Sequence, residues 1–413
     1  MDKSILDKIC RRIDTYEEES IKLQRELTAI PALSPENDGE GEQKKADFLK
    51  GYLSNDLGLK DVKNYDAPDD RVPSGRRPNL IAILPGKNPS RTIWIMSHTD
   101  VVPPGDRSQW QGDPWTIRVE DGKIYGRGTE DNQQGIVSSL LTAKAFIDEG
   151  IQPQYNIGLL LVADEETSSK YGIQYLLENH RNLFKQDDYY IIPDSGNAEG
   201  TFVEVSEKSI VWFKFKIQGK QTHGSTPELG HNAFKAGAHL IVKLDQLYEK
   251  FNLSDPVFDP PISTFEPTKK EANVPNVNTI PGEDIFYFDC RIHPTYDLAE
   301  VKDFVQGLCR EIEPAFSVKI EVTTPQELIA APPTPVDAKV VKAVQRALRD
   351  LRNLKTSPMG IGGGTVAAYF REVGLDTVVW ATQDETLHGP NEYVSIKNIL
   401  DDAKVFAHIA LQE

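Results

Sequence analysis

Four apolar runs in the first half of the chain lack the polar alternation of a half-exposed strand. They are residues 79–84, 92–96, 155–163 and 189–192. Such runs are typical of β-strands that are covered on both faces, and therefore of sheets that lie between helices. Helical patterns accompany them at residues 17–30, 42–53, 134–149 and 170–179. This succession predicts a three-layer α/β domain.

The pattern changes near Ile210. Residues 211–217 and 285–292 alternate between apolar and polar, which is typical of antiparallel strands with one face in water. Helices are predicted at 232–248 and 298–312, and a further strand at 317–322. We interpret this βαββαβ-like unit as an insertion, after which helices at 336–352 and 396–411 and a strand at 377–381 complete the first domain. The predicted boundaries are 1–209 and 326–413 for the first domain and 210–325 for the inserted one.

Length and charge exclude several classes of protein. A chain of 413 residues is too long for one ordinary core, so two or three domains are expected. The formal net charge of −17 argues against nucleic acid as a partner, because phosphate binding needs basic surface. Bound divalent metal would offset part of this acidity.

Cysteine usage and hydropathy predict a cytoplasmic protein. Cys10, Cys290 and Cys309 are odd in number, far apart and not arranged as CxxC, so no disulfide framework is expected. The apolar run 157–163 is far shorter than the roughly 20 residues that span a bilayer. The N-terminal residues form an amphipathic pattern that differs from a signal peptide. We therefore expect no membrane role.

Histidines and carboxylates follow the ends of the predicted strands. His98-Thr99-Asp100, Asp164-Glu165-Glu166 and Asp194 each close an apolar run, Asp131 lies in a glycine-rich turn, and His388 follows the last strand. Oxygen and imidazole donors without cysteine suit a pair of catalytic divalent cations such as zinc. Because α/β proteins place their sites where strands end, we expect these side chains to converge at one sheet edge.

Taken singly, these residues also have structural interpretations. His98 and Asp100 are either a surface pair or a metal ligand with the carboxylate that orients it. Asp131 would equally cap the helix that begins near Gln134. Glu165 and Glu166 would form a solvated acidic loop, or one would bind metal while the other acts as a base. Three consecutive acids after an apolar strand are nevertheless costly unless cations neutralise them.

The glycine-rich segment 360–365 is a candidate binding loop. It lacks both the lysine of a P-loop and the GxGxxG spacing of a dinucleotide site, so a nucleotide-binding role has little support. A nest of backbone N–H groups for a carboxylate is the better interpretation.

Together these motifs give the chain a family resemblance. It resembles the co-catalytic dinuclear zinc amidohydrolase and exopeptidase family of acetylornithine deacetylase, succinyl-diaminopimelate desuccinylase, aminoacylase and carnosine-type dipeptidases. Besides the motifs above, the matching stretches are Gly126-Arg127-Gly128, His223-Gly224-Ser225, Asn278-Thr279-Ile280 with Arg291, and Gly363-Gly364-Thr365. The chain departs from the deacylase pattern after Thr365, where those enzymes often have an acidic residue and this chain has Val366. The resemblance implies a zinc-exopeptidase-like catalytic domain with a ferredoxin-like lid and dimerisation domain.

The resemblance also implies a role for each matching residue. Two Zn²⁺ ions, with Co²⁺ or Mn²⁺ as substitutes, would be held by His98, Asp131, Glu166, Asp194 and His388, with Asp131 bridging and followed by a cis peptide. Glu165 would be the general base for a dizinc-activated water, and Asp100 the partner of His98. His223 would stabilise the oxyanion, acting across a dimer interface. Asn278, Arg291, Gly363, Gly364 and Thr365 would bind substrate. From sequence alone, His223 also fits an exposed turn, and Arg291 a cross-strand salt bridge.

The function expected from the resemblance is hydrolysis of an amide bond in an N-acyl amino acid. A metallodipeptidase or carboxypeptidase is the alternative within the family. A metal-free binding protein on the same fold is the alternative from another class. The expected partners are a small N-acyl amino acid or dipeptide and a second copy of the chain, bound through the inserted domain.

Overall fold

The computed structural model describes residues 2–413, which form two compact units. The first contains the described residues up to Val205, together with Thr334–Pro358 and Tyr369–Glu413. The second contains Ser206–Pro333 and the short segment Met359–Ala368, which carries the glycine-rich loop. The α/β fold with an inserted α+β domain is therefore confirmed, whereas the predicted domain boundaries stay predictions.

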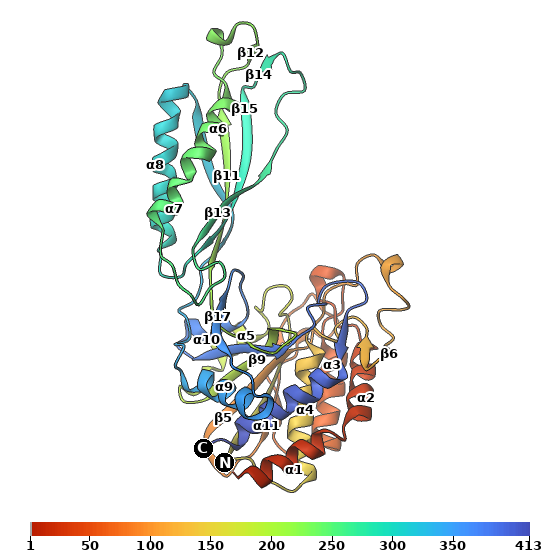
Figure 1. Ribbon diagram of the computed structural model, residues 1–413. Coiled ribbons are helices and arrows are strands. Elements are labelled where there is room, and N and C mark those ends of the chain that lie inside the picture. Colours follow the sequence, from red (N-terminus) through yellow and green to blue (C-terminus); the bar gives the residue numbers. More distant parts are fainter. Residues whose placement is uncertain (1) are drawn as a thin grey trace. The chain divides into compact units, whose positions relative to one another are not determined.

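An eight-stranded mixed sheet in the order β1-β4-β8-β5-β9-β18-β10-β17 belongs mainly to the first unit, and its last two strands, β10 and β17, continue into residues of the second unit (Figure 1). Its strands are β1 (Val62–Asn64), β4 (Leu80–Leu84), β8 (Tyr155–Val162), β5 (Asn88–His98), β9 (Tyr189–Asn197), β18 (Thr377–Thr382), β10 (Phe202–Glu207) and β17 (Ser357–Ile361). The four central strands, from β8 to β18, run parallel. Their carboxyl ends therefore meet at one edge of the sheet, as the apolar runs predict.

The first unit contains most of the helices, and some of them bury the centre of the sheet. The helices are α1 (Lys3–Ile13), α2 (Glu17–Thr28), α3 (Gln43–Gly51), α4 (Gln133–Asp148), α5 (Ile173–Asn179), α9 (Lys339–Arg352), α10 (Ala367–Glu372) and α11 (Ile396–Leu411). α4 packs on β5, β8 and β9, α11 packs on β8 and β18, and α1 and α2 contact both helices. Most of α4 is buried, because it lies between the sheet and these outer helices.

The first unit also contains two small sheets. β2 (Ala67–Pro68) pairs with β3 (Arg76–Arg77). β6 (Arg118–Glu120), β7 (Lys123–Tyr125) and β19 (Tyr393–Ser395) form a three-stranded sheet in the order β19-β7-β6. The second of these brings the segment after β7 beside the segment before β19.

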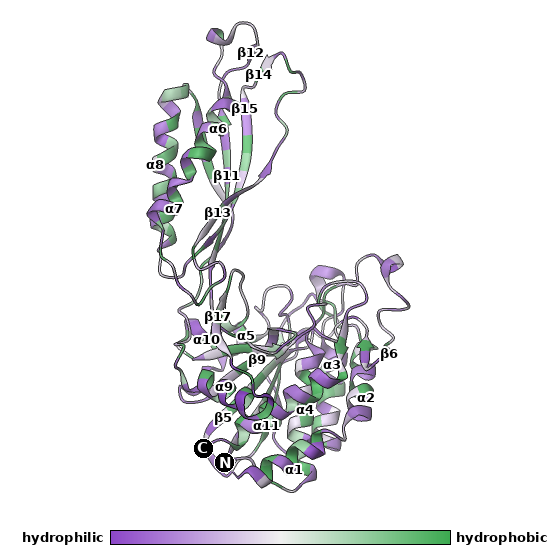
Figure 2. Ribbon diagram, in the orientation of Figure 1, coloured by the Kyte–Doolittle hydropathy of each residue, from purple (hydrophilic) through white to green (hydrophobic). Residues whose placement is uncertain are grey.

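The second unit is a four-stranded antiparallel sheet with helices on one face. Its order is β13 (Thr264–Lys270), β15 (Glu283–Ile292), β11 (Ser209–Gln218) and β16 (Lys319–Leu328). The helices are α6 (Ala233–Leu244), α7 (Gln246–Lys250) and α8 (Leu298–Phe316), and β12 (Thr222–His223) pairs with β14 (Thr279–Ile280). Along β15 buried residues alternate with less buried ones, because only one face meets the helices, and the strand carries both hydrophobic and hydrophilic residues (Figure 2).

One strand of the second unit, β13, is not predicted by the sequence pattern. β13 buries only Phe265, and its other residues are polar or exposed. It lies at the edge of the sheet and contains Pro267 beside a break in its pairing with β15. Edge strands tolerate proline and need no apolar alternation, which explains why periodicity does not reveal this one.

Within residues 2–413 no helix combines the length and the hydrophobicity that a membrane span requires.

Candidate metal centre

Four neighbouring parallel strands deliver the predicted ligands to one edge of the main sheet. His98 is the last residue of β5, and the acidic segment of Glu165 and Glu166 follows β8. Asp194 lies in the last part of β9, and the loop that carries His388 follows β18. Asp131 comes from the turn that precedes α4. The convergence expected from the strand ends is thus present for all five predicted ligands.

The first group consists of His98, Asp131 and Asp194, whose donor atoms all lie within 4.8 Å of one another. Nε2 of His98 is 2.8 Å from Oδ1 of Asp131 and 3.4 Å from Oδ1 of Asp194. The imidazole is almost completely buried. One nitrogen and two carboxylate oxygens therefore face a common point.

The second group consists of Asp131, Glu166 and His388, again within 4.8 Å. Nε2 of His388 is 3.1 Å from both Oδ2 of Asp131 and Oε2 of Glu166. Asp131 thus belongs to both groups and turns a different oxygen toward each histidine. A carboxylate in this position can bridge two cations.

The charges around this centre favour cations. The salt bridges found among residues 2–413 give no lysine or arginine partner to Asp131, Glu165, Glu166 or Asp194. Oε1 of Glu166 is buried and has no hydrogen-bond partner among the described residues. Burial raises the pKa of Glu165 far above its usual value, and the charge of Asp194 adds to this rise. An unpartnered oxygen amid crowded carboxylates fits divalent metal, which would satisfy both.

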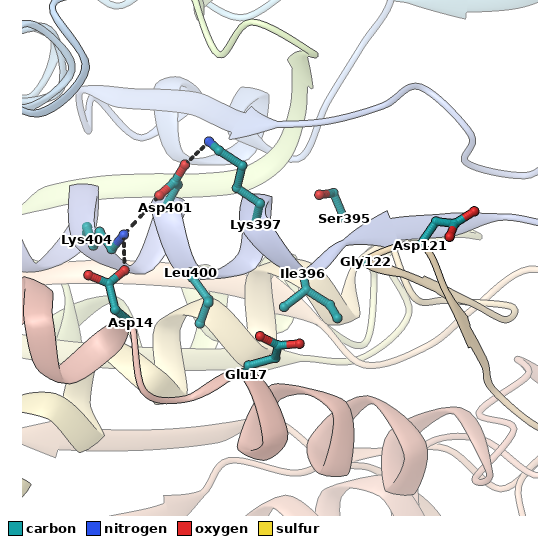
Figure 3. Close-up of a pocket in the computed structure, with 10 residues that line it drawn as sticks. All are labelled: Asp14, Glu17, Asp121, Gly122, Ser395, Ile396, Lys397, Leu400, Asp401 and Lys404. Atoms are coloured by element: carbon teal, nitrogen blue, oxygen red, sulfur yellow. Dashed lines mark hydrogen bonds and ion pairs between the residues drawn. The ribbon is translucent and has the colours of Figure 1, made fainter.

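Another acidic hollow in the first unit has a different charge balance. It has a volume of about 500 Å³ and lies between α11 and the N-terminal helices (Figure 3). There Lys404 lies 2.5 Å from Asp14 and 3.1 Å from Asp401, which also pairs with Lys397. Lysines thus neutralise carboxylates in this hollow, whereas among residues 2–413 the ion-pair partners found for Asp131, Asp194 and Glu166 are the histidines His98 and His388.

Comparison with known proteins identifies the family. The sequence model of the family described as Peptidase family M20/M25/M40 matches residues 94–412. An uncharacterized metallohydrolase of Methanococcus maripaludis is 41% identical over an alignment of 428 positions, which covers 98% of this chain and 99% of that relative. The chain belongs to peptidase family M20/M25/M40.

More distant similarities also extend over nearly the whole chain. A succinyl-diaminopimelate desuccinylase of Nitratiruptor is 25% identical over 397 residues, covering 92% of this chain and 96% of that relative. The crystal structure of human carnosine dipeptidase 1 matches with a TM-score of 0.69 at 20% identity, covering 98% of each chain. The predicted fold class, family and metallohydrolase character are confirmed. Membership of a metallohydrolase family also leaves the metal-free binding protein without support.

In the candidate metal centre, Asp100 contacts both His98 and the segment of Glu165 and Glu166. Nδ1 of His98 lies 3.1 Å from the main-chain oxygen of Asp100 and 3.5 Å from its Oδ1. The Asp100 carboxylate also accepts the backbone N–H groups of Glu165 at 3.1 Å and Glu166 at 3.0 Å. β5 ends at His98, so Asp100 reaches the imidazole from a loop and not, as strand periodicity suggests, from the same strand face.

Asn132 is a residue of the centre that sequence reasoning missed. The predicted cis peptide between Asp131 and Asn132 is present. Nδ2 of Asn132 donates to Oδ1 of Asp194 at 2.5 Å and to the carbonyl of Pro193 at 2.7 Å. Asn132 thereby ties the Asp131 turn to the strand that carries Asp194. Sequence reasoning also missed Glu130 and Glu392, which are buried.

The remaining predicted site residues belong to the second unit. They are His223, Asn278, Arg291, Gly363, Gly364 and Thr365. Arg291 donates through Nε and Nη2 to Asp289 at 2.6 and 3.1 Å, and through Nη1 to the carbonyl of Gly362 at 2.7 Å. The backbone N–H and the hydroxyl of Thr365 donate to Glu207 at 3.0 and 2.5 Å. Asn278 precedes β14, whose Thr279 pairs with His223 of β12.

Proposed function

We propose that this M20 metallohydrolase cleaves the amide bond of an N-acyl amino acid with the help of two zinc ions. His98, Asp131 and Asp194 would hold one ion, and Asp131, Glu166 and His388 the other. The observation that carries the proposal is Asp131, whose Oδ1 lies 2.8 Å from Nε2 of His98 while Oδ2 lies 3.1 Å from Nε2 of His388. Cobalt or manganese would suit the same oxygen and imidazole donors.

Glu165 is the proposed general base. When bound, two divalent cations supply a water of lowered pKa and polarise the scissile carbonyl. Glu165 belongs to neither ligand group, yet its Oε2 is only 3.9 Å from Nε2 of His98. Its carboxylate would take a proton from the water and give it to the departing amine. Asp100 accepts the Glu165 backbone N–H and would fix the position of Glu165 relative to His98.

Arg291 is proposed to bind the substrate's carboxylate. A guanidinium has five N–H donors, and three of those on Arg291 are engaged by Asp289 and Gly362. One donor remains on each terminal nitrogen, which suits a bidentate carboxylate. Asn278, Gly363, Gly364 and Thr365 would complete this subsite, and Thr365 would then exchange its bond to Glu207 for one to substrate.

A substrate panel tests the proposal. The purified protein, loaded with zinc, would be assayed with N-acetyl and N-succinyl amino acids, with dipeptides, and with longer peptides that have a free C-terminus. We expect the highest kcat/KM for an N-acyl amino acid. Preference for dipeptides or for longer peptides would instead assign a metallodipeptidase or a carboxypeptidase, and absence of zinc-dependent hydrolysis would reject all three.

His223 is proposed to stabilise the oxyanion, and its hydrogen bonds suit that role. The backbone N–H of Ser225 donates to Nδ1 of His223 at 3.2 Å. In the neutral imidazole the proton then lies on Nε2, which becomes the free donor. The side chain is exposed in the single chain, as a group that acts on a partner's site would be.

We expect His223→Ala to lower kcat by roughly 10²–10³-fold and to change KM much less, because an oxyanion donor acts mainly on the transition state. Initial rates over a range of substrate concentrations separate the two constants. His231→Ala is the matched control, since His231 is another exposed histidine of the same unit. A rise in KM at constant kcat would contradict the oxyanion role.

We also propose that the protein is a cytoplasmic homodimer joined through the second unit. Phe234 and Val242 of α6 are 47% and 70% exposed, and a dimer interface on this helix would cover both side chains. Val242→Glu should therefore convert a dimer into single chains, as measured by light scattering after size-exclusion chromatography. Val336→Glu, at a valine of the first unit that is 50% exposed, is the control and should leave the mass unchanged. An unchanged mass for Val242→Glu would contradict this interface.

A further inference from the structure

Two buried glutamates, Glu130 and Glu392, lie beside the candidate metal ligands without belonging to either ligand group. Glu130 immediately precedes Asp131, and Glu392 follows His388 by four residues. Each glutamate binds the segment that contains the other one. Glu392 accepts hydrogen bonds from the turn of Asp131, and Glu130 accepts them from the loop that leads to His388.

Glu392 binds the turn that carries Asp131. Its Oε1 accepts the backbone N–H groups of Glu130 at 2.9 Å and Asp131 at 3.0 Å. Its Oε2 accepts the backbone N–H of Gly128 at 3.0 Å and a guanidinium N–H of Arg127 at 2.6 Å. Both oxygens are thus fully used, and three of the four donors are main-chain groups of the turn.

Glu130 binds the loop that leads to His388. Its Oε1 accepts the backbone N–H of Asp384 at 2.6 Å, and its Oε2 accepts the backbone N–H and the hydroxyl of Thr386 at 2.6 and 2.7 Å. Arg127 completes the connection, because its Nη2 donates to the carbonyls of His388 at 3.2 Å and Gly389 at 3.3 Å.

The His388 loop needs such support. Glu385, His388 and Asn391 all have positive φ, which is unfavourable for residues other than glycine. Contacts from outside the loop must therefore hold its backbone. Strand pairing holds the chain on either side of this loop, in β18, which ends at Thr382, and at Tyr393 of β19, which lies opposite Tyr125 of β7.

We propose that Glu130 and Glu392 act as a reciprocal clamp that sets the spacing between Asp131 and His388. Neither glutamate touches the reacting atoms, so both are positioning residues. The inference rests on the proposed function, in which Asp131 and His388 bind metal. Because Asp131 is shared by both ligand groups whereas His388 belongs to one, the two halves of the clamp have different expected effects.

Metal titration of the metal-free protein tests the clamp. Glu130→Gln and Glu392→Gln keep the side-chain shape but turn one oxygen into an N–H donor that faces other donors. Glu130→Gln should weaken only the second equivalent of Zn²⁺ by about 10–100-fold, the usual effect of removing a partner of a metal ligand. Glu392→Gln should weaken both equivalents by at least about tenfold, and Glu392→Asp should restore part of the affinity.

Asp188→Asn is the matched control. Asp188 is also buried, and it accepts the backbone N–H of Thr92 at 2.7 Å, the indole N–H of Trp94 at 3.0 Å and the backbone N–H of Lys185 at 3.2 Å. It contacts β5 six and four residues before His98, so its loss should lower the melting temperature without changing zinc affinity. Calorimetry with Zn²⁺ gives the affinities, and thermal melting of the metal-free proteins gives the stability.

The outcomes separate the clamp from the metal centre itself. If the wild-type protein binds no zinc, the proposed function fails. If it binds two equivalents and both glutamine variants match Asp188→Asn in affinity, only the clamp is overturned. Should either variant fail to fold, Thr386→Val removes the hydroxyl that donates to Glu130, together with its hydrogen bonds to the backbone of Tyr393, and should still weaken the second equivalent by several-fold. An unchanged second equivalent in that variant would also overturn the clamp.

Discussion

Glu165→Ala is expected to lower kcat by about 10²–10⁴-fold while the protein keeps both equivalents of metal, because general-base catalysis contributes about that factor. The side chain lies beside both ligand groups but supplies no atom to either. Its backbone N–H remains bonded to Asp100, so the truncation leaves the orientation of His98 intact. Steady-state rates and metal content measured by plasma mass spectrometry give the two readouts.

The neighbouring residue supplies the matched control. Glu166→Ala removes one carboxylate from the same strand end, yet Glu166 is a candidate ligand and its Oε2 lies 3.1 Å from Nε2 of His388. This variant should lose activity together with one equivalent of metal. If Glu165→Ala also loses metal, or turns over at near the normal rate, Glu165 is not the base.

The sequence predicts those parts of the centre that depend on buried strands. The runs that become β5, β8 and β9 are apolar throughout, so their ends are visible, and His98, Glu166 and Asp194 stand at or near those ends. Parallel pairing then brings the ends together without any further information. The inserted sheet is visible for a similar reason, because β11 and β15 alternate between buried and exposed residues.

The supporting residues were not predictable in the same way. Glu130 and Glu392 look like ordinary loop acids, and their partners lie about 260 positions away in the sequence. Nothing local signals that these carboxylates are buried, since their burial follows from the pairing of β7 with β19. Asn132 is hidden likewise, because its contact with Asp194 joins a turn to a distant strand. Acids that flank a predicted ligand could have been flagged as candidate supports.

Asp131→Ala is expected to abolish binding of both metal ions and all zinc-dependent turnover. Asp131 is the only residue common to the two ligand groups found among residues 2–413. Its loss removes one of three protein ligands from each ion. Zinc at about 100 times its Kd should stabilise the wild-type protein by roughly 2.7 kcal/mol per site, and this stabilisation should disappear in the variant. Thermal melting with and without zinc measures the difference, without reference to any substrate.

His388→Ala separates a bridging role from a general loss of structure. His388 belongs to one group only and its side chain is half exposed, so its removal disturbs packing little. It should leave one equivalent bound at His98, Asp131 and Asp194, and about half of the zinc-induced stabilisation. A graded series, from two equivalents in the wild type to one in His388→Ala and none in Asp131→Ala, requires that Asp131 serve both ions. One equivalent of metal in both variants would show that Asp131 is a ligand of one ion at most, and the shared-ligand geometry would then have no role in metal binding.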